Sequence, residues 1–200
     1  MIGLCFLLKE YPDHPDAASW KEAIRIFCKN YLEEMSTRSA FGIVPYGFFS
    51  NEQKGNRRIG KYWYRWFMER QRRAGSDSER WWVGINANLA SAGVVFIKAA
   101  DLLDDPSLKA LAQRQLDWIV GVNPYNASTV SGVGYNQPRR YIPGAFDPPT
   151  PNIPGAVMNG IGGSDDDEPD IYPGSWQTCE YWTPMLCYTM WLEAEIQKSD

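Results

Sequence analysis

Apolar side chains recur three or four residues apart along much of this chain, which is the spacing of one helix face. Residues 2–10 form a first short run of this kind, which ends at Tyr11-Pro12. In the second run Asp16 can act as an N-cap, so the pattern predicts a helix over residues 17–37. Its apolar positions are Trp20, Ile24, Phe27, Cys28, Tyr31 and Met35.

The middle of the chain contains three more helical patterns. Residues 62–73 alternate cations with aromatic side chains at helical spacing, which favours an amphipathic helix. Residues 86–103 are rich in Ala, Leu and Val with few charges, as a helix surrounded by others would be. Ser107 can cap the next helix, which we expect to end near Val120-Gly121 because Asn123-Pro124 follows.

Two long segments lack this period. Residues 39–60 are divided by Gly and Pro and indicate a structured loop, with a short strand, whose aromatics either contact a ligand or pack on the core. Residues 124–183 hold nine of the fourteen prolines. An irregular segment this long inside a compact domain is usually functional, so we expect the site here. The last helix should then begin with Thr183 as N-cap, Pro184 first, and run to Gln197.

Composition describes an ordinary globular chain and excludes several partners. It is 44% hydrophobic and 22% charged over 200 residues, so one domain is the default expectation. A net charge of −4 gives no electrostatic case for nucleic acid. The apolar N-terminus, residues 1–8, is too short for a membrane span and lacks a basic flank. Nine Trp, eleven Tyr and eight Phe suit a sugar-binding cleft or a large core.

The cysteines give little reason to expect a metal or cofactor. Four occur without C-x-x-C spacing, and His14 is the single histidine, so a zinc site has few ligands available. Free thiols are favoured over disulfides for Cys5, Cys28, Cys179 and Cys187. We therefore expect no cofactor, apart from a candidate calcium ion at the acidic run of residues 165–170.

Acids and aromatics gather in residues 165–184, just before the last helix. Glu180 is a carboxyl group flanked by Trp176, Tyr181 and Trp182, which makes it a candidate for acid–base chemistry. A second candidate segment places Arg139 and Arg140 beside two tyrosines, Tyr135 and Tyr141, and suits sugar hydroxyls or a carboxylate.

Three stretches resemble the C-terminal half of family 9 glycoside hydrolases, the cellulase-type enzymes. They are residues 86–92 (NANLASA), 112–125 (AQRQLDWIVGVNPY) and 131–135 (SGVGY), within a likeness that covers residues 40–200 in order. The resemblance implies an all-α fold, the (α/α)6 six-hairpin toroid of inverting β-glycan hydrolases, with the active site in loops at one end. It also implies that Glu180, in the loop before the final helix, is the general acid.

The chain departs from the family pattern at two places. Where the family usually has a Pro-His-His-Arg-like segment, this chain has Pro138-Arg139-Arg140-Tyr141. The family's base is an Asp in an Asp-Ala-Gly-Asp-like motif, which does not occur in these 200 residues. Asp170 is a candidate base or orienting acid, and the acidic run of residues 165–170 could replace the base or hold calcium, although such runs are more often solvated.

Length supports the expectation that residues 1–200 are the C-terminal part of a single catalytic domain. A twelve-helix toroid needs about 350 residues at about 15 to 20 residues per helix plus loops, whereas this sequence predicts about six helices. Apolar faces meant for the remaining helices would then be exposed. We expect self-association or association with a missing N-terminal half.

The leading hypothesis is a glycoside hydrolase that cleaves a β-linked glucan or related polysaccharide by an inverting acid/base mechanism. Candidate substrate contacts are Tyr135, Arg139 and Arg140, with Trp176, Tyr181 and Trp182 as stacking platforms. Two alternatives stay open: a catalytically inactive carbohydrate-binding protein of the same fold, and a helical-toroid polysaccharide lyase or uronyl hydrolase that uses Arg139 and Arg140 as a carboxylate clamp. The chain itself encodes no location, but the family resemblance implies a secreted or periplasmic protein.

Overall fold

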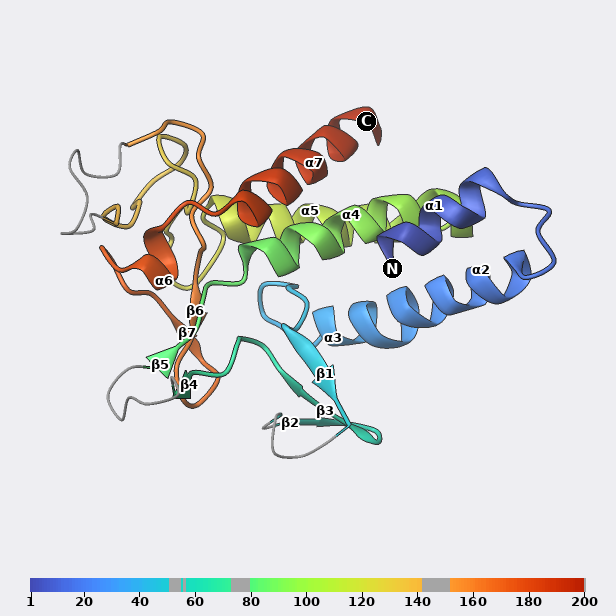
Figure 1. Ribbon diagram of the computed structural model, residues 1–200, viewed down its shortest axis with the longest axis horizontal. Helices are drawn as coiled ribbons and strands as arrows, with labels where there is room; N and C mark the ends of the chain where they lie inside the picture. Colours follow the sequence, from blue (N-terminus) through green and yellow to red (C-terminus); the bar gives the residue numbers. More distant parts are fainter. Residues whose placement is uncertain (51–54, 56, 73–79, 142–151, 200) are drawn as a thin grey trace. The chain divides into compact units, whose positions relative to one another are not determined.

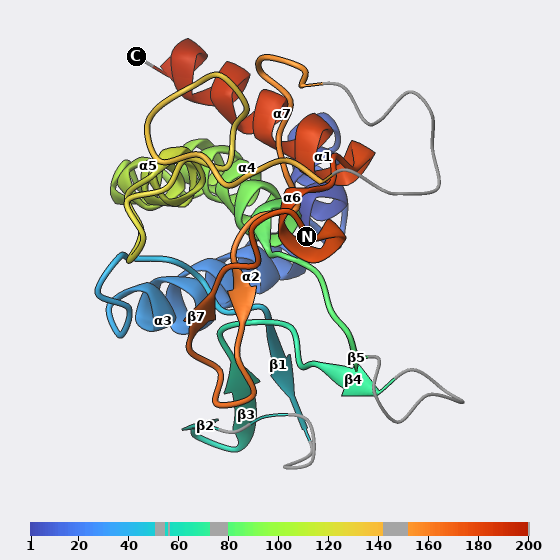
Figure 2. The same cartoon turned by 90° about the vertical axis from the view of Figure 1, so that its left-hand side faces the viewer.

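The computed structural model describes residues 1–50, 55, 57–72, 80–141 and 152–199, and every structural statement below concerns these residues. Helices dominate, and three small antiparallel sheets accompany them (Figures 1 and 2). The chain divides into two compact units. Unit 1 comprises Met1–Val44, Asn88–Trp118 and Cys187–Asp200, and unit 2 comprises Pro45–Ala87 and Ile119–Leu186.

The N-terminal helices follow the predicted pattern. Helix α1 spans Ile2–Glu10, and α2 (Ala17–Arg25), the π-helix η1 (Ile26–Glu33) and α3 (Glu34–Ser36) form one continuous helical segment. Asp16 occupies the N-cap position, as predicted, but its side chain makes no capping bond, and its main-chain N–H donates to Nδ1 of His14 at 3.1 Å.

Three long helices confirm three of the four remaining helical patterns: α4 (Asn86–Leu103), α5 (Ser107–Val120) and α7 (Thr183–Ser199). Helices α4 and α5 run side by side as an antiparallel pair (Figure 1). Two caps differ from prediction. The main-chain N–H of Ser107 donates to Oδ1 of Asp105 at 3.1 Å, so Asp105 is the capping side chain, and Thr183 lies inside α7.

The core of unit 1 is built from the apolar faces that the sequence predicted. Its fully buried side chains come from the helical segment 17–36, α4, α5 and α7, and include Ile24, Met35, Phe96, Trp118 and Leu192. Buried Gln115 fastens the loop that follows the first helices, because its amide accepts from the N–H of Val44 and donates to the carbonyl of Gly42, each at 3.0 Å. All four cysteines lie in the described residues, and each is a free thiol, as predicted.

Unit 2 contradicts the prediction of a helix over residues 62–73. Instead β1 (Gly47–Phe49), β2 (Arg57–Ile59) and β3 (Tyr62–Arg65) form an antiparallel sheet in the order β1-β3-β2. Phe48 pairs with Tyr64, and Gly60 adopts a φ of +54° at the hairpin turn between β2 and β3. Aromatic residues favour strands once a partner strand is present, and the sequence window alone does not show that partner.

The rest of unit 2 carries the segment that precedes α7. Two short antiparallel pairs occur, β4 (Gln71–Arg72) with β5 (Arg80–Trp81) and β6 (Gly162–Gly163) with β7 (Pro169–Asp170). A four-residue helix, α6 (Trp176–Cys179), follows and was not predicted. The described parts of residues 124–183 are otherwise irregular, as expected, and they contain Glu180 and its aromatic neighbours.

Candidate active site around Glu180

Glu180 terminates α6 and lies three residues before α7 begins. It occupies the C-cap position of α6 in extended conformation, with φ −77° and ψ 149°, so the chain turns out of the short helix at this residue. The side chain is half-buried. Its Oε2 accepts a hydrogen bond of 2.5 Å from the indole Nε1 of Trp182. The carboxylate therefore has a fixed partner two residues away.

Two tryptophans lie beside this carboxylate. The rings of Trp176 and Trp182 are 6.3 Å apart between centroids and only 9° from parallel. Both are half-buried, so each ring keeps some exposed surface. An exposed indole face is a favourable surface for the apolar face of a sugar ring. The structure thus brings together three of the predicted site residues, Trp176, Glu180 and Trp182.

The backbone around Glu180 is held by two other segments. The carbonyl of Glu180 accepts from the main-chain N–H of Asn159 at 2.9 Å, and that of Thr178 accepts from Gly160 at 2.9 Å. The carbonyl of Gln177 accepts from Gly84 at 3.0 Å. Sequence reasoning did not identify these supporting residues, Asn159, Gly160 and Gly84. The glycines at 84 and 160 were the available signal, since close backbone approach often requires glycine.

Cys179 and Tyr181 flank Glu180 in the chain. Burial raises the pKa of the Cys179 thiol, which therefore stays neutral beside the carboxyl group. The predicted stacking residue Tyr181 forms an antiparallel bridge with Met158, and its hydroxyl is buried without a hydrogen-bond partner among the described residues. The hydroxyl of Tyr181 is thus directed into the protein, although its ring is only half-buried.

The predicted arginines precede this cluster in the chain, and the main chain of Arg139 lies close to it in space. The carbonyl of Arg139 accepts from the main-chain N–H of Gly174 at 2.7 Å, which places Arg139 beside the turn that leads into α6. Its side chain is exposed, while that of Arg140 is half-buried. Tyr135 is 81% exposed, and its carbonyl accepts from the N–H of Ser128 at 2.9 Å. Tyr135 makes no described contact with the Glu180 cluster.

Most of the predicted acidic run is bound to arginines. Asp167 is 1% exposed and accepts hydrogen bonds from Nη1 of Arg57 at 2.7 Å and from the N–H groups of Trp66 and Phe67 at 3.0 and 2.9 Å. Burial raises the pKa of Asp167, against the opposing effect of these donors. Glu168 pairs with Nη2 of Arg57 at 2.8 Å. These carboxylates therefore anchor the loop to the β1-β3-β2 sheet.

Asp170, the candidate base or orienting acid, forms an ion pair with Arg70. The guanidinium of Arg70 also donates to the carbonyl of Gly163 at 2.7 Å and lies over the rings of Trp82 and Tyr172, at 4.8 and 4.9 Å. The partner of the Asp170 carboxylate is thus the guanidinium group of Arg70. Within the part of the chain that the structure describes, no three His, Cys, Asp or Glu side chains converge as metal ligands.

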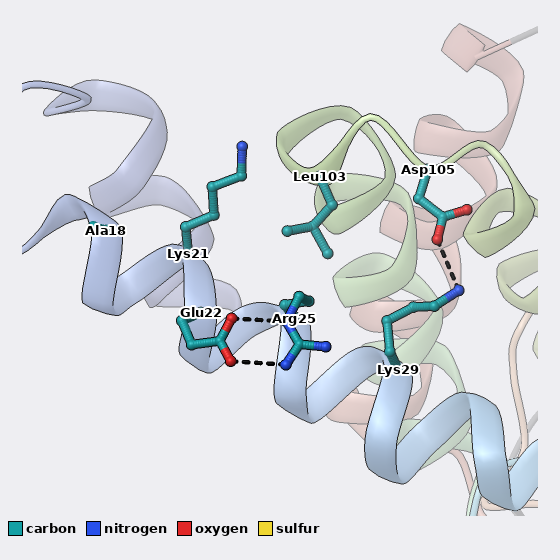
Figure 3. A pocket seen from close by; sticks show the side chains of 7 residues that line it. All are labelled: Ala18, Lys21, Glu22, Arg25, Lys29, Leu103 and Asp105. Carbon is teal, nitrogen blue, oxygen red and sulfur yellow. Dashed lines mark hydrogen bonds and ion pairs between the residues drawn. The ribbon is translucent and has the colours of Figure 1, made fainter.

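A separate cavity of about 490 Å³ lies in unit 1 (Figure 3). Its charged lining is largely paired: Glu22 binds Arg25 through two hydrogen bonds of 2.7 Å, and Lys29 binds Asp105 at 2.8 Å. Such pairs stabilise the packing of helices, and Glu180 is not among the lining residues. This cavity is therefore separate from the candidate site around Glu180.

None of the described helices combines the length and the apolar character needed to cross a membrane.

A family model and solved structures are similar to this chain. The family model described as "Glycosyl hydrolase family 9" matches residues 9–188. A solved structure of the cellulase Cel9M of C. cellulolyticum in complex with cellobiose is 24% identical, with 59% of this chain and 30% of that chain covered and a TM-score of 0.46. Another structure of Cel9M is 23% identical over the same shares, with a TM-score of 0.47. The match therefore spans less than a third of those chains. Comparison with curated proteins gives no match.

Proposed function

Because this chain belongs to glycosyl hydrolase family 9, we propose that it is a glycoside hydrolase of β-linked glucans in which Glu180 is the general acid. The observation that carries the proposal is the hydrogen bond from the Trp182 indole to the Glu180 carboxylate, next to the near-parallel rings of Trp176 and Trp182. A proton donor and a stacking surface for a sugar ring are thus adjacent.

The proposed mechanism is inverting. A protonated Glu180 transfers its proton to the leaving glycosidic oxygen, while a second carboxylate about 6.5–9.5 Å away activates water on the opposite face of the sugar. Trp176 and Trp182 would hold the ring so that its glycosidic oxygen reaches Oε1 or Oε2 of Glu180. The preference for a β-linked glucan, the export of the protein and its action outside the cell follow from the family and are part of the proposal.

We place the base outside these residues. The family's Asp-Ala-Gly-Asp-like motif does not occur in the sequence, and Asp167, Glu168 and Asp170 each pair with an arginine. We therefore propose that residues 1–200 form the C-terminal part of one (α/α)6 catalytic domain. Exposed apolar side chains on α1 and α7, including Phe6, Leu7 and Met190, support an association with the remaining helices or with a second copy.

The same absence of the motif keeps a second function open, that of a catalytically inactive carbohydrate-binding protein. One experiment separates the two. Reducing-end release from β-glucans and from uronic-acid glycans is measured for the complete catalytic domain, which supplies the proposed base, and for the same domain with Glu180→Gln, together with binding of the same glycans. Removing a general acid slows catalysis by about 10²- to 10⁴-fold, so hydrolysis should be lost in the variant.

The possible results distinguish three functions: a hydrolase, an inactive binding protein, and a lyase or uronyl hydrolase. Hydrolysis of β-glucan that is lost in Glu180→Gln supports the hydrolase. Equal β-glucan binding by both proteins without hydrolysis supports the inactive binding protein. Release from uronic-acid glycans alone would favour the lyase or uronyl hydrolase and would contradict the proposal, as would hydrolysis that survives the substitution.

A further inference from the structure

We infer that Asn159 is a positioning residue for the candidate active site, acting through α6 on Trp176 and Glu180. The inference rests on the proposed function only for the role of Glu180. The amide Nδ2 of Asn159 donates to the carbonyl of Trp176 at 2.8 Å, and its main-chain N–H donates to the carbonyl of Glu180 at 2.9 Å. One residue thus binds both ends of the segment that carries the stacking ring and the acid.

The short helix depends on bonds of this kind. A four-residue helix is not stable by itself, since forming the first turn fixes several residues for very few internal bonds. Within α6, the N–H of Glu180 reaches the carbonyl of Trp176 only at 3.4 Å, which is long for a hydrogen bond. Asn159 Nδ2 gives the same carbonyl a shorter bond. The position of Trp176 is therefore set largely from outside the helix.

Burial makes this assignment specific. Asn159 is fully buried, and its Oδ1 has no hydrogen-bond partner among the described residues. A buried, unsatisfied amide oxygen is unfavourable, so an asparagine at this position needs a compensating role. The Nδ2 donor to Trp176 supplies one, and an apolar side chain of similar size could not replace it.

Asn86 provides a matched control. It too is fully buried with an unpartnered Oδ1, but its Nδ2 donates to Oγ1 of Thr129 at 2.8 Å and to the carbonyl of Met158 at 3.0 Å. Its side chain therefore makes no bond to α6, although its main-chain N–H donates to the carbonyl of Asn159 at 3.2 Å. Replacing either asparagine with leucine removes one buried amide beside the same segment, and only Asn159→Leu removes a hydrogen bond to α6.

The test uses circular dichroism, because two near-parallel indoles so close together couple their transitions and give a paired positive and negative band. Subtracting the spectrum of Trp176→Phe from that of the parent protein isolates this band. We expect the band to be lost in Asn159→Leu and retained in Asn86→Leu. Asn159→Asp, which keeps the shape but replaces the donor with an acceptor, should lose it as well and serves if Asn159→Leu does not fold.

Hydrolysis gives a second readout. With β-glucan as substrate, we expect kcat for Asn159→Leu to fall about tenfold or more below that of Asn86→Leu, since small misplacement of a catalytic group is costly. Hydrolysis is measured in the complete catalytic domain, because we place the base outside residues 1–200. If that domain does not hydrolyse glycans, the proposed function fails while the spectra still test the inference. A coupled band that survives in both Asn159 variants, or is lost equally in Asn86→Leu, would overturn it.

Discussion

The indole Nε1 of Trp182 donates a hydrogen bond of 2.5 Å to Oε2 of Glu180. This contact joins two residues that lie on either side of Tyr181, in the short stretch between α6 and α7. A hydrogen bond to a charged carboxylate is stronger than one between neutral groups. It limits the rotation of the Glu180 side chain and leaves its second oxygen, Oε1, available to a substrate.

We predict that Trp182→Phe separates catalysis from binding. Phenylalanine retains an aromatic ring beside Trp176 but has no donor for Glu180, so the carboxyl group should lose its fixed orientation. In β-glucan hydrolysis we expect kcat to fall about tenfold, as for other losses of orientation, while KM changes by less than about twofold. Steady-state kinetics checks this. An unchanged kcat would show that the hydrogen bond has no part in the reaction.

Gly84 is predicted to be essential for the backbone support beneath α6. A Cβ atom at this position would lie 2.1 Å from the carbonyl oxygen of Gly160 and 2.4 Å from that of Asn159, and backbone atoms cannot easily move away. We expect Gly84→Ala to lower the free energy of unfolding by about 1–3 kcal/mol, the usual cost of overpacking. Urea denaturation measures the change.

The matched control for this substitution is Gly3→Ala in α1. A Cβ at Gly3 meets no atom within 4 Å, and alanine is a better helix former than glycine. The free energy of unfolding should therefore rise by up to about 1 kcal/mol. Equal effects of the two substitutions would contradict the proposed close packing at Gly84.

The ion pair between Lys29 and Asp105 should make stability depend on pH. The hydrogen bond from Lys29 lowers the pKa of Asp105 below its ordinary value of 3.8, and the hydroxyl of Ser107 adds to this effect. The folded protein therefore binds the proton of Asp105 less readily than the unfolded chain. The resulting stabilisation is fully present above pH 3.8 and is lost as the pH falls through the lower, folded pKa.

Asp105→Asn tests this dependence. At pH 7 we expect it to lower the free energy of unfolding by about 0.5–1.5 kcal/mol, since the pair is partly exposed. The difference from the parent protein should shrink as the pH is lowered below 3.8. Lys29→Met removes this pair and also the pair of Lys29 with Glu33, so the loss at pH 7 should be at least as large. A difference that stays constant from pH 7 to pH 3 would rule out the ionised pair as its source.

The sequence by itself determined the long helices and the family. Helices α4 and α5 have the predicted bounds to within a residue, because a helix is stabilised by contacts between residues three and four apart, and these are visible in a short window. The motifs that resemble family 9 glycoside hydrolases also lie within short windows, and the family model confirms them. The roles of Glu180 and its aromatic neighbours stay predictions for the experiments above.

Only the tertiary structure decided where pairing occurs between distant residues. Residues 62–65 form a strand because β1 and β2 pair with them, although their own spacing also fits a helix. Asp167 reaches Arg57 across 110 residues, so one acid of a run that suggested calcium or catalysis is a buried anchor. Asn159 reaches Trp176 in the same way. Such contacts depend on which segments meet in space, and local periodicity carries no information about that.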